Sequence, residues 1–205
     1  MNARERNDLI ISWVTLSIAF TLVISDSLLS LMSLAEALPI ALIGVGSGFI
    51  FHELAHRNVA RHFGYHAEFR AWMNGLILAV VFAVVSFGRF TFAAPGATYI
   101  FAHAIPRDQN GKISIAGPVT NIIIGFIFMI VSLFVADKFV FNVLFNAGWI
   151  NFFLAGFNLL PIGPLDGRKV MNWSMAAWLI TIGVAGTMIL FPQIFYIGTV
   201  IALGI

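Results

Sequence analysis

The chain has 205 residues, of which 60% are hydrophobic and only 10% are charged, and its formal net charge is +2. Soluble domains carry about a quarter charged residues, so this composition excludes an ordinary soluble domain and predicts an integral membrane protein. The basic residues lie beside apolar segments and form no basic stripe, which argues against nucleic-acid binding. Cysteine is absent, so disulfides, thiolate zinc ligands and a cysteine nucleophile are excluded.

Long apolar segments predict a series of membrane helices, since about 20 apolar residues cross a bilayer. We expect five, at 9–31, 37–64, 113–136, 139–160 and 172–191. The first is longer than a signal-peptide core and has no convincing cleavage site after it, so we expect it to be a retained helix. A short break at 33–36 precedes the second helix, which starts near Ala37 and Pro39. Residues 192–205 are too few to span alone, and either extend the last helix through a kink or lie in the interface.

The stretch from Tyr65 to Lys112 is the least regular part of the chain. Residues 71–88 are apolar, 89–101 alternate around Pro95 and Gly96, and 107–112 read as a polar turn. The alternating part predicts strands and a turn, while a re-entrant segment, a hairpin and a pair of spans stay open for 71–101. The expected fold is an all-α polytopic membrane protein with five to six transmembrane helices and a short re-entrant or β-hairpin segment near the active site.

The most informative motif is His52-Glu53-Leu54-Ala55-His56 inside the second helix. On a helix, both imidazoles point to one side and can bind one metal ion, while Glu53 is rotated away from them. Two neutral histidines beside a carboxylate that accepts a proton from water are typical of zinc hydrolases. Composition produces such a motif by chance only roughly two times in a thousand. The alternative is a histidine pair packed in a helix interface.

A catalytic zinc takes three protein ligands, and two candidates remain for the third. His62 has the outer spacing of the metzincin motif, but Val59 stands where that motif needs a helix-breaking glycine. Asp166 follows Pro164 at the end of an apolar helix, where an aspartate is costly unless it has a cationic partner or lies at the surface. On the same helix as the histidines, Gly44 and Gly48 would let another helix approach closely.

Three motifs together resemble the site-2 protease family of intramembrane zinc metalloproteases, in its minimal prokaryotic form. They are His52-Glu53-x-x-His56, Gly117-Pro118-Val119-Thr120-Asn121, and Asn158-x-x-Pro161-x-x-Pro164-Leu165-Asp166-Gly167, in that order. The resemblance implies one Zn²⁺ per chain, held by His52, His56 and Asp166, with Glu53 as the general base. It also places Asn121 and Asn158 near the active site, where they would orient the substrate or the oxyanion. Ala55 stands where many members have glycine, a change between small residues.

Because apolar segments run throughout the 205 residues, we expect a single membrane domain over 1–205. The resemblance spans about 50–169 and implies an intramembrane metalloprotease domain with its catalytic core at about 37–170. Its partners would be the lipid bilayer and a transmembrane protein substrate, which must unwind locally and which the edge of 89–101 could hold extended. A plain connecting hairpin is the other reading of that segment. The competing function is a zinc-binding transporter or metal-handling protein. A second enzyme alternative, another class of membrane zincin, needs a later glutamate ligand, and none follows Glu68.

A shared zinc site also predicts topology. The helix that carries the histidines and the helix that precedes Asp166 must run in the same direction, so residues 65–112 must return to the face that they left. Every Lys and Arg except Lys138 then lies at or toward one face, which the positive-inside rule makes cytoplasmic. We therefore expect a protein of a prokaryotic cell membrane, with its N-terminus and active-site face in the cytoplasm.

Overall fold

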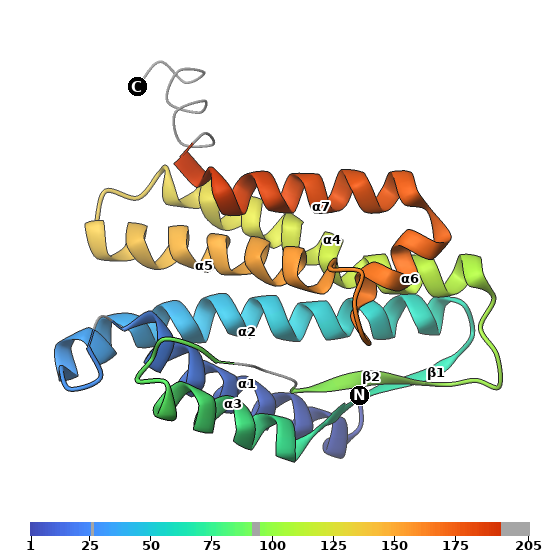
Figure 1. Ribbon diagram of the computed structural model, residues 1–205, viewed down its shortest axis with the longest axis horizontal. Helices are drawn as coiled ribbons and strands as arrows, with labels where there is room; N and C mark the ends of the chain where they lie inside the picture. The colour runs from blue at the N-terminus through green and yellow to red at the C-terminus, as the bar shows by residue number, and fades with distance from the viewer. Residues whose placement is uncertain (26, 92–94, 194–205) are drawn as a thin grey trace.

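A computed structural model describes residues 1–25, 27–91 and 95–193 and is mostly helical (Figure 1). The helices are α1 (Ala3–Ile24), α2 (Leu31–His62), α3 (Met73–Val85), α4 (Arg107–Ser132), α5 (Lys138–Asn158), α6 (Asp166–Trp173) and α7 (Met175–Leu190), and the strands are β1 (His66–Ala71) and β2 (Gly96–Phe101). By length and apolar composition, α1, α2, α4 and α5 can each cross a membrane, whereas α3 and α7 are shorter apolar helices. The prediction of a helical, membrane-type fold is confirmed. The total of five to six spans stays a prediction.

Helix α2 runs through the middle of the molecule, with α1, α3 and the strands on one side and α4 to α7 on the other (Figure 1). It points in the same direction as α5 and opposite to α1 and α4, as the shared-site argument predicts. Strands β1 and β2 pair in antiparallel fashion, with His66 opposite Phe101 and Ala71 opposite Gly96. Because α3 lies between them in the sequence, the chain leaves the C-terminal end of α2, passes through α3 and returns to the same end.

Three predicted helix starts are wrong. Helix α1 runs from Ala3 to Ile24 rather than over 9–31, because the side chain of Asn2 accepts the backbone N–H of Glu5 and caps the first turn. The expected break at 33–36 lies inside α2.

Helix α2 begins at Leu31 rather than near Ala37, because the side chain of Ser30 accepts the backbone N–H of Ser33 and caps the first turn. Pro39 therefore lies inside the helix, which membrane helices tolerate. The expected polar turn at 107–112 is the start of α4, where Lys112 Nζ lies 2.7 Å from Asp108 Oδ2 across one helical turn.

The strand region was predicted only in part. Strand β2 confirms the alternation seen in 89–101, since its residues are by turns partly buried and exposed. Strand β1 was not predicted. The expected helix at 172–191 is interrupted at Ser174, which caps α7 by accepting the N–H of Ala177. The prediction for residues 192–205 lies outside the described residues from 194 onward.

The topology prediction also places Arg89 at the wrong end of the helices. A Cβ on Gly88 would come 2.4 Å from the carbonyl oxygen of Leu22, near the C-terminal end of α1. Arg89 follows directly, so it lies at the far end of α1 from Arg4 and Arg6 rather than with them. The error arose because α3 carries the chain toward that far end before β2 brings it back.

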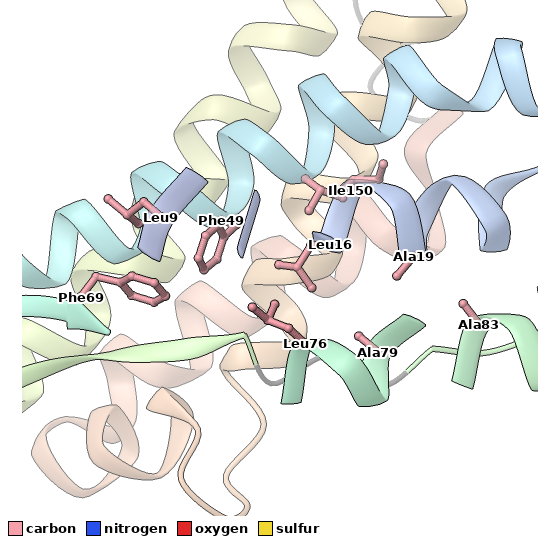
Figure 2. Close-up of a cluster of buried hydrophobic side chains, with 10 residues drawn as sticks. Leu9, Leu16, Ala19, Phe49, Phe69, Leu76, Ala79, Ala83 and Ile150 are labelled. Atoms are coloured by element: carbon pink, nitrogen blue, oxygen red, sulfur yellow. The ribbon is translucent and has the colours of Figure 1, made fainter. Parts of the chain in front are cut away.

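The main apolar core joins α1, α2, α3 and β1 with Ile150 of α5 (Figure 2). Phe49 of α2 and Phe69 of β1 meet edge to face with ring centroids 5.3 Å apart. On the other side of α2, a Cβ on Gly44 or Gly48 would come within 2.8 Å of Ile150 or 2.6 Å of Leu154, both on α5. The predicted close approach of a helix to these two glycines is thus confirmed, and it fixes α2 against α5.

Candidate metal centre

Three potential metal ligands meet at the C-terminal half of α2. Nε2 of His52 and Nε2 of His56 lie 2.9 Å apart, and Oδ2 of Asp166 lies 3.3 Å from the first and 3.1 Å from the second. All three residues are nearly or fully buried. The group satisfies the geometry of a metal site within the described part of the chain. We call these three residues the metal cluster.

The chemistry of the three atoms fits a cation. Nδ1 of His56 lies 2.7 Å from the carbonyl oxygen of Ile113 and must donate to it, so in the neutral ring Nε2 carries the lone pair. This lone pair faces a carboxylate oxygen and a second imidazole nitrogen, which repel it unless a positive charge lies between them. Ligands about 2.0–2.1 Å from a tetrahedral zinc lie about 3.3 Å from one another. The observed separations of 2.9, 3.1 and 3.3 Å come close to that value.

Helix α4 forms one wall of the metal cluster. A Cβ added to Gly117 would come 2.4 Å from Nε2 of His56 and 2.6 Å from Nε2 of His52. Only glycine therefore lets α4 lie close enough for the Ile113 carbonyl to reach His56. The sequence analysis identified Gly117 as part of a motif, but it did not show that this glycine faces His52 and His56.

The segment between α5 and α6 brings Asp166 back to α2. Gly163 has φ +54°, a left-handed conformation that favours glycine, and a Cβ on Gly167 would come 2.0 Å from the carbonyl oxygen of Leu159. These two positions turn the chain sharply after α5. Burial acts to raise the pKa of Asp166, but the adjacent His56 and His52 hold that pKa well below its ordinary value.

Glu53 lies beside the metal cluster and contacts β2. Oγ1 of Thr98 lies 2.8 Å from Oε2 of Glu53 and 3.1 Å from its backbone oxygen. The sequence analysis did not identify Thr98, which is 45 residues away in the chain. Only the alternating pattern around it pointed to a strand.

The other candidate residues lie as follows. Asn121 is fully buried on α4, one turn beyond Gly117, and neither of its side-chain polar atoms has a partner among the described residues. Asn158 ends α5 and donates to the carbonyl oxygen of Leu154, 2.9 Å away. The structure does not bring His62 to the metal cluster, because its side chain is exposed and stacks edge-on against Phe63. Asp166 instead is the third member of the possible metal site.

Comparison with known proteins gives consistent relatives. The chain is 51% identical over 142 residues to "Putative zinc metalloprotease MJ0611" of Methanocaldococcus jannaschii, an alignment that covers 69% of this chain and 73% of that protein. It is 32% identical over 153 residues to "Putative zinc metalloprotease YwhC" of Bacillus subtilis, covering 66% and 68%. It is 28% identical over 124 residues to "Zinc metalloprotease MJ0392" of M. jannaschii, covering 60% and 30%. No family model and no solved structure matches the chain.

Proposed function

Because this chain belongs to the zinc metalloprotease family, we propose that it is an intramembrane protease of the site-2 type, which cleaves transmembrane segments of other membrane proteins. Its cofactor is zinc, for which His52, His56 and Asp166 form a possible site. The observation that carries the proposal is the position of this site on α2, a helix long and apolar enough to span a membrane. The relatives give no support to a zinc transporter.

The depth of the site supports access from one face of the membrane. His56 lies six residues before the end of α2 at His62 and His52 ten residues before it, or roughly 9 and 15 Å along the helix. The basic residues Arg57, Arg61, Arg168 and Lys169 lie near the same end of the molecule. We propose that this end is cytoplasmic, together with the N-terminus, by the positive-inside rule.

The residues around the cluster then have separate roles. When bound, zinc lowers the pKa of water and polarises a carbonyl group. Glu53 would accept a proton from water at the scissile bond and pass it to the leaving amine. The Ile113 carbonyl holds His56 in one tautomer through the 2.7 Å bond to Nδ1. The polar side-chain atoms of the buried Asn121 have no partner in the described part of the chain, which suits a group that bonds to the substrate. We assign Asn158 the same role by resemblance alone.

The edge of β2 is the best place for an extended substrate. The outer edge of β1 is covered by α1: Phe69 N–H donates to Glu5 Oε1 at 3.2 Å and Ala71 N–H to Asp8 Oδ2 at 3.4 Å. In an antiparallel pair, two residues opposite each other either both direct their N–H and C=O groups toward the partner strand or both direct them away from it. Thr98 is opposite Phe69, so its own N–H and C=O point away from β1. There they have no backbone partner within residues 1–25, 27–91 and 95–193 and can pair with a substrate strand.

The test uses the zinc-loaded protein in liposomes with a transmembrane reporter. Glu53→Gln is expected to keep zinc near one per chain and to lose cleavage by several orders of magnitude, because it removes the base but no ligand. His52→Ala and His56→Ala are expected to lose both. A Glu53→Gln protein that still cleaves would remove Glu53 from the mechanism. A wild-type protein that moves zinc across the membrane but cleaves nothing would favour the transporter.

A further inference from the structure

Thr98 is the residue of β2 whose hydroxyl contacts α2 at Glu53. Its hydroxyl carries one proton, and two oxygens of Glu53 compete for it: the carboxylate Oε2 at 2.8 Å and the backbone oxygen at 3.1 Å. A charged acceptor forms the shorter and stronger bond, and the backbone oxygen already lies within the helix. The Thr98 hydroxyl therefore donates its hydrogen bond to Oε2 of Glu53.

This contact leaves the carboxylate asymmetric. Oε2 is held by Thr98, whereas Oε1 accepts no hydrogen bond from any residue in the described ranges. One oxygen therefore fixes the plane of the carboxylate, and the other stays free to accept a proton. Glu53 otherwise has several rotatable bonds, and a base loses efficiency when its oxygen is not within hydrogen-bond reach of the proton.

We propose that Thr98 is a positioning residue, whose hydroxyl orients the Glu53 carboxylate and links that orientation to the strand edge where the substrate pairs. This inference rests on the proposed function, because both roles that it gives to Thr98 belong to peptide cleavage. Its backbone faces the free edge, and its side chain restrains the base. An extended substrate that orders β2 at Thr98 would therefore also order the oxygen that accepts the proton.

The kinetic test compares Thr98→Val, which keeps the shape but removes the hydroxyl, with Thr98→Ser, which keeps the hydroxyl. Thr98→Val is expected to lower kcat about 10- to 100-fold with KM within about twofold and zinc content unchanged. Thr98→Ser should keep most of the activity. Thr181→Val makes the same change on α7, where the hydroxyl donates to the carbonyl oxygen of Ala177 at 2.7 Å, and serves as the control. In a Glu53→Gln background, Thr98→Val should cause no further loss.

A second readout does not depend on cleavage. Protein labelled with ¹³C-glutamate gives an infrared carboxylate band for Glu53 by difference from Glu53→Gln, and Thr98→Val should shift this band while Thr98→Ser should not. If the wild-type protein cleaves no reporter, the proposed function fails, but the band still shows whether the contact exists. An unshifted band, an unchanged kcat in Thr98→Val, or a loss that appears only in KM would overturn the inference.

Discussion

His56 and Arg57 are neighbours on α2 but belong to two different buried polar clusters. His56 faces the metal cluster. Arg57 faces α1, where its Nη1 lies 3.1 Å from Oε1 of the fully buried Glu5. The same carboxylate is 3.9 Å from Arg61 and accepts the N–H of Phe69 at 3.2 Å. We call Glu5, Arg57, Arg61 and this N–H the anchor cluster.

The two clusters differ in charge balance. In the anchor cluster, one carboxylate faces two guanidinium groups and a backbone donor, so its negative charge is compensated by side chains without a ligand and the cluster joins α1, α2 and β1. Oε2 of Glu5 accepts no hydrogen bond from the described residues, but it lies 3.9 Å from Arg61. In the metal cluster, a carboxylate faces two imidazoles in which at least the lone pair of His56 points inward. Buried polar residues alone thus do not mark a functional site. A functional site is indicated when a buried carboxylate and imidazole lone pairs face one another without a compensating positive charge.

The largest expected effect comes from a substitution that blocks the metal cluster but leaves its three residues unchanged. In Gly117→Ala the new Cβ would lie 2.4 Å from Nε2 of His56, so we expect zinc to be lost and cleavage to fall by several orders of magnitude, with the helical circular dichroism kept. Gly48→Ala is the control, because its Cβ meets the flexible end of Leu154 at 2.6 Å. This control should keep zinc and lose about 1–3 kcal/mol of stability. Zinc retained in Gly117→Ala would contradict the geometry of the site.

The next largest effect separates the two candidates for third ligand. Asp166→Ala should weaken zinc binding on the order of a hundredfold or more, since losing a ligand costs more than losing a residue that supports one. His62→Ala should bind zinc as the wild type does, because the His62 side chain is exposed. Competition with a chromophoric zinc chelator measures both affinities. The opposite order would restore the metzincin-like reading.

The anchor cluster predicts a change in stability without a change in zinc binding. Glu5→Gln leaves Arg57, whose side chain is 12% exposed, without its counter-charge, which should cost about 3–5 kcal/mol. Glu36→Gln removes an exposed carboxylate from the same half of the chain and should cost little. Denaturation in detergent and zinc titration measure the two properties separately. A Glu5→Gln protein that loses zinc affinity would show that the clusters are coupled through α2.

The two histidines of the metal cluster could be predicted from sequence because their spacing is local, whereas Asp166, far along the chain, was chosen over His62 only through the resemblance of three motifs to a known family. His52 and His56 are one helical turn apart, and the prolines and glycines around Asp166 mark a turn at the end of an apolar helix. The anchor cluster could not be predicted, since Glu5 and Arg57 are 52 residues apart and an isolated pair of opposite charges carries no pattern. Thr98 was missed for the same reason.

Errors in the fold follow a similar division. Apolar length identified the helices, but it misplaced the start of α4, whose first turns are polar and are stabilised by the Lys112–Asp108 pair. Strand β1 was missed because half of its residues are charged or polar, and what orders it is non-local: β2 on one edge and the carboxylates of α1 on the other. Such partners become visible only in the folded chain.

The smallest expected effect lies at the margin of the anchor cluster, where Glu68 of β1 responds to pH. Its carboxylate accepts hydrogen bonds from Asn2 at 2.7 Å and His66 at 3.1 Å and pairs with Arg70, and these contacts hold the pKa of Glu68 below its ordinary value of 4.5. Because the folded protein favours the charged form, this stabilisation is complete above that value and is lost as the pH falls below it. Wild type should therefore exceed Glu68→Gln in Tm by about 2–4 °C at most near neutral pH, with the difference closing between about pH 5 and 3. A Tm difference that stays constant over this range would show that Glu68 stabilises β1 through packing rather than through its charge.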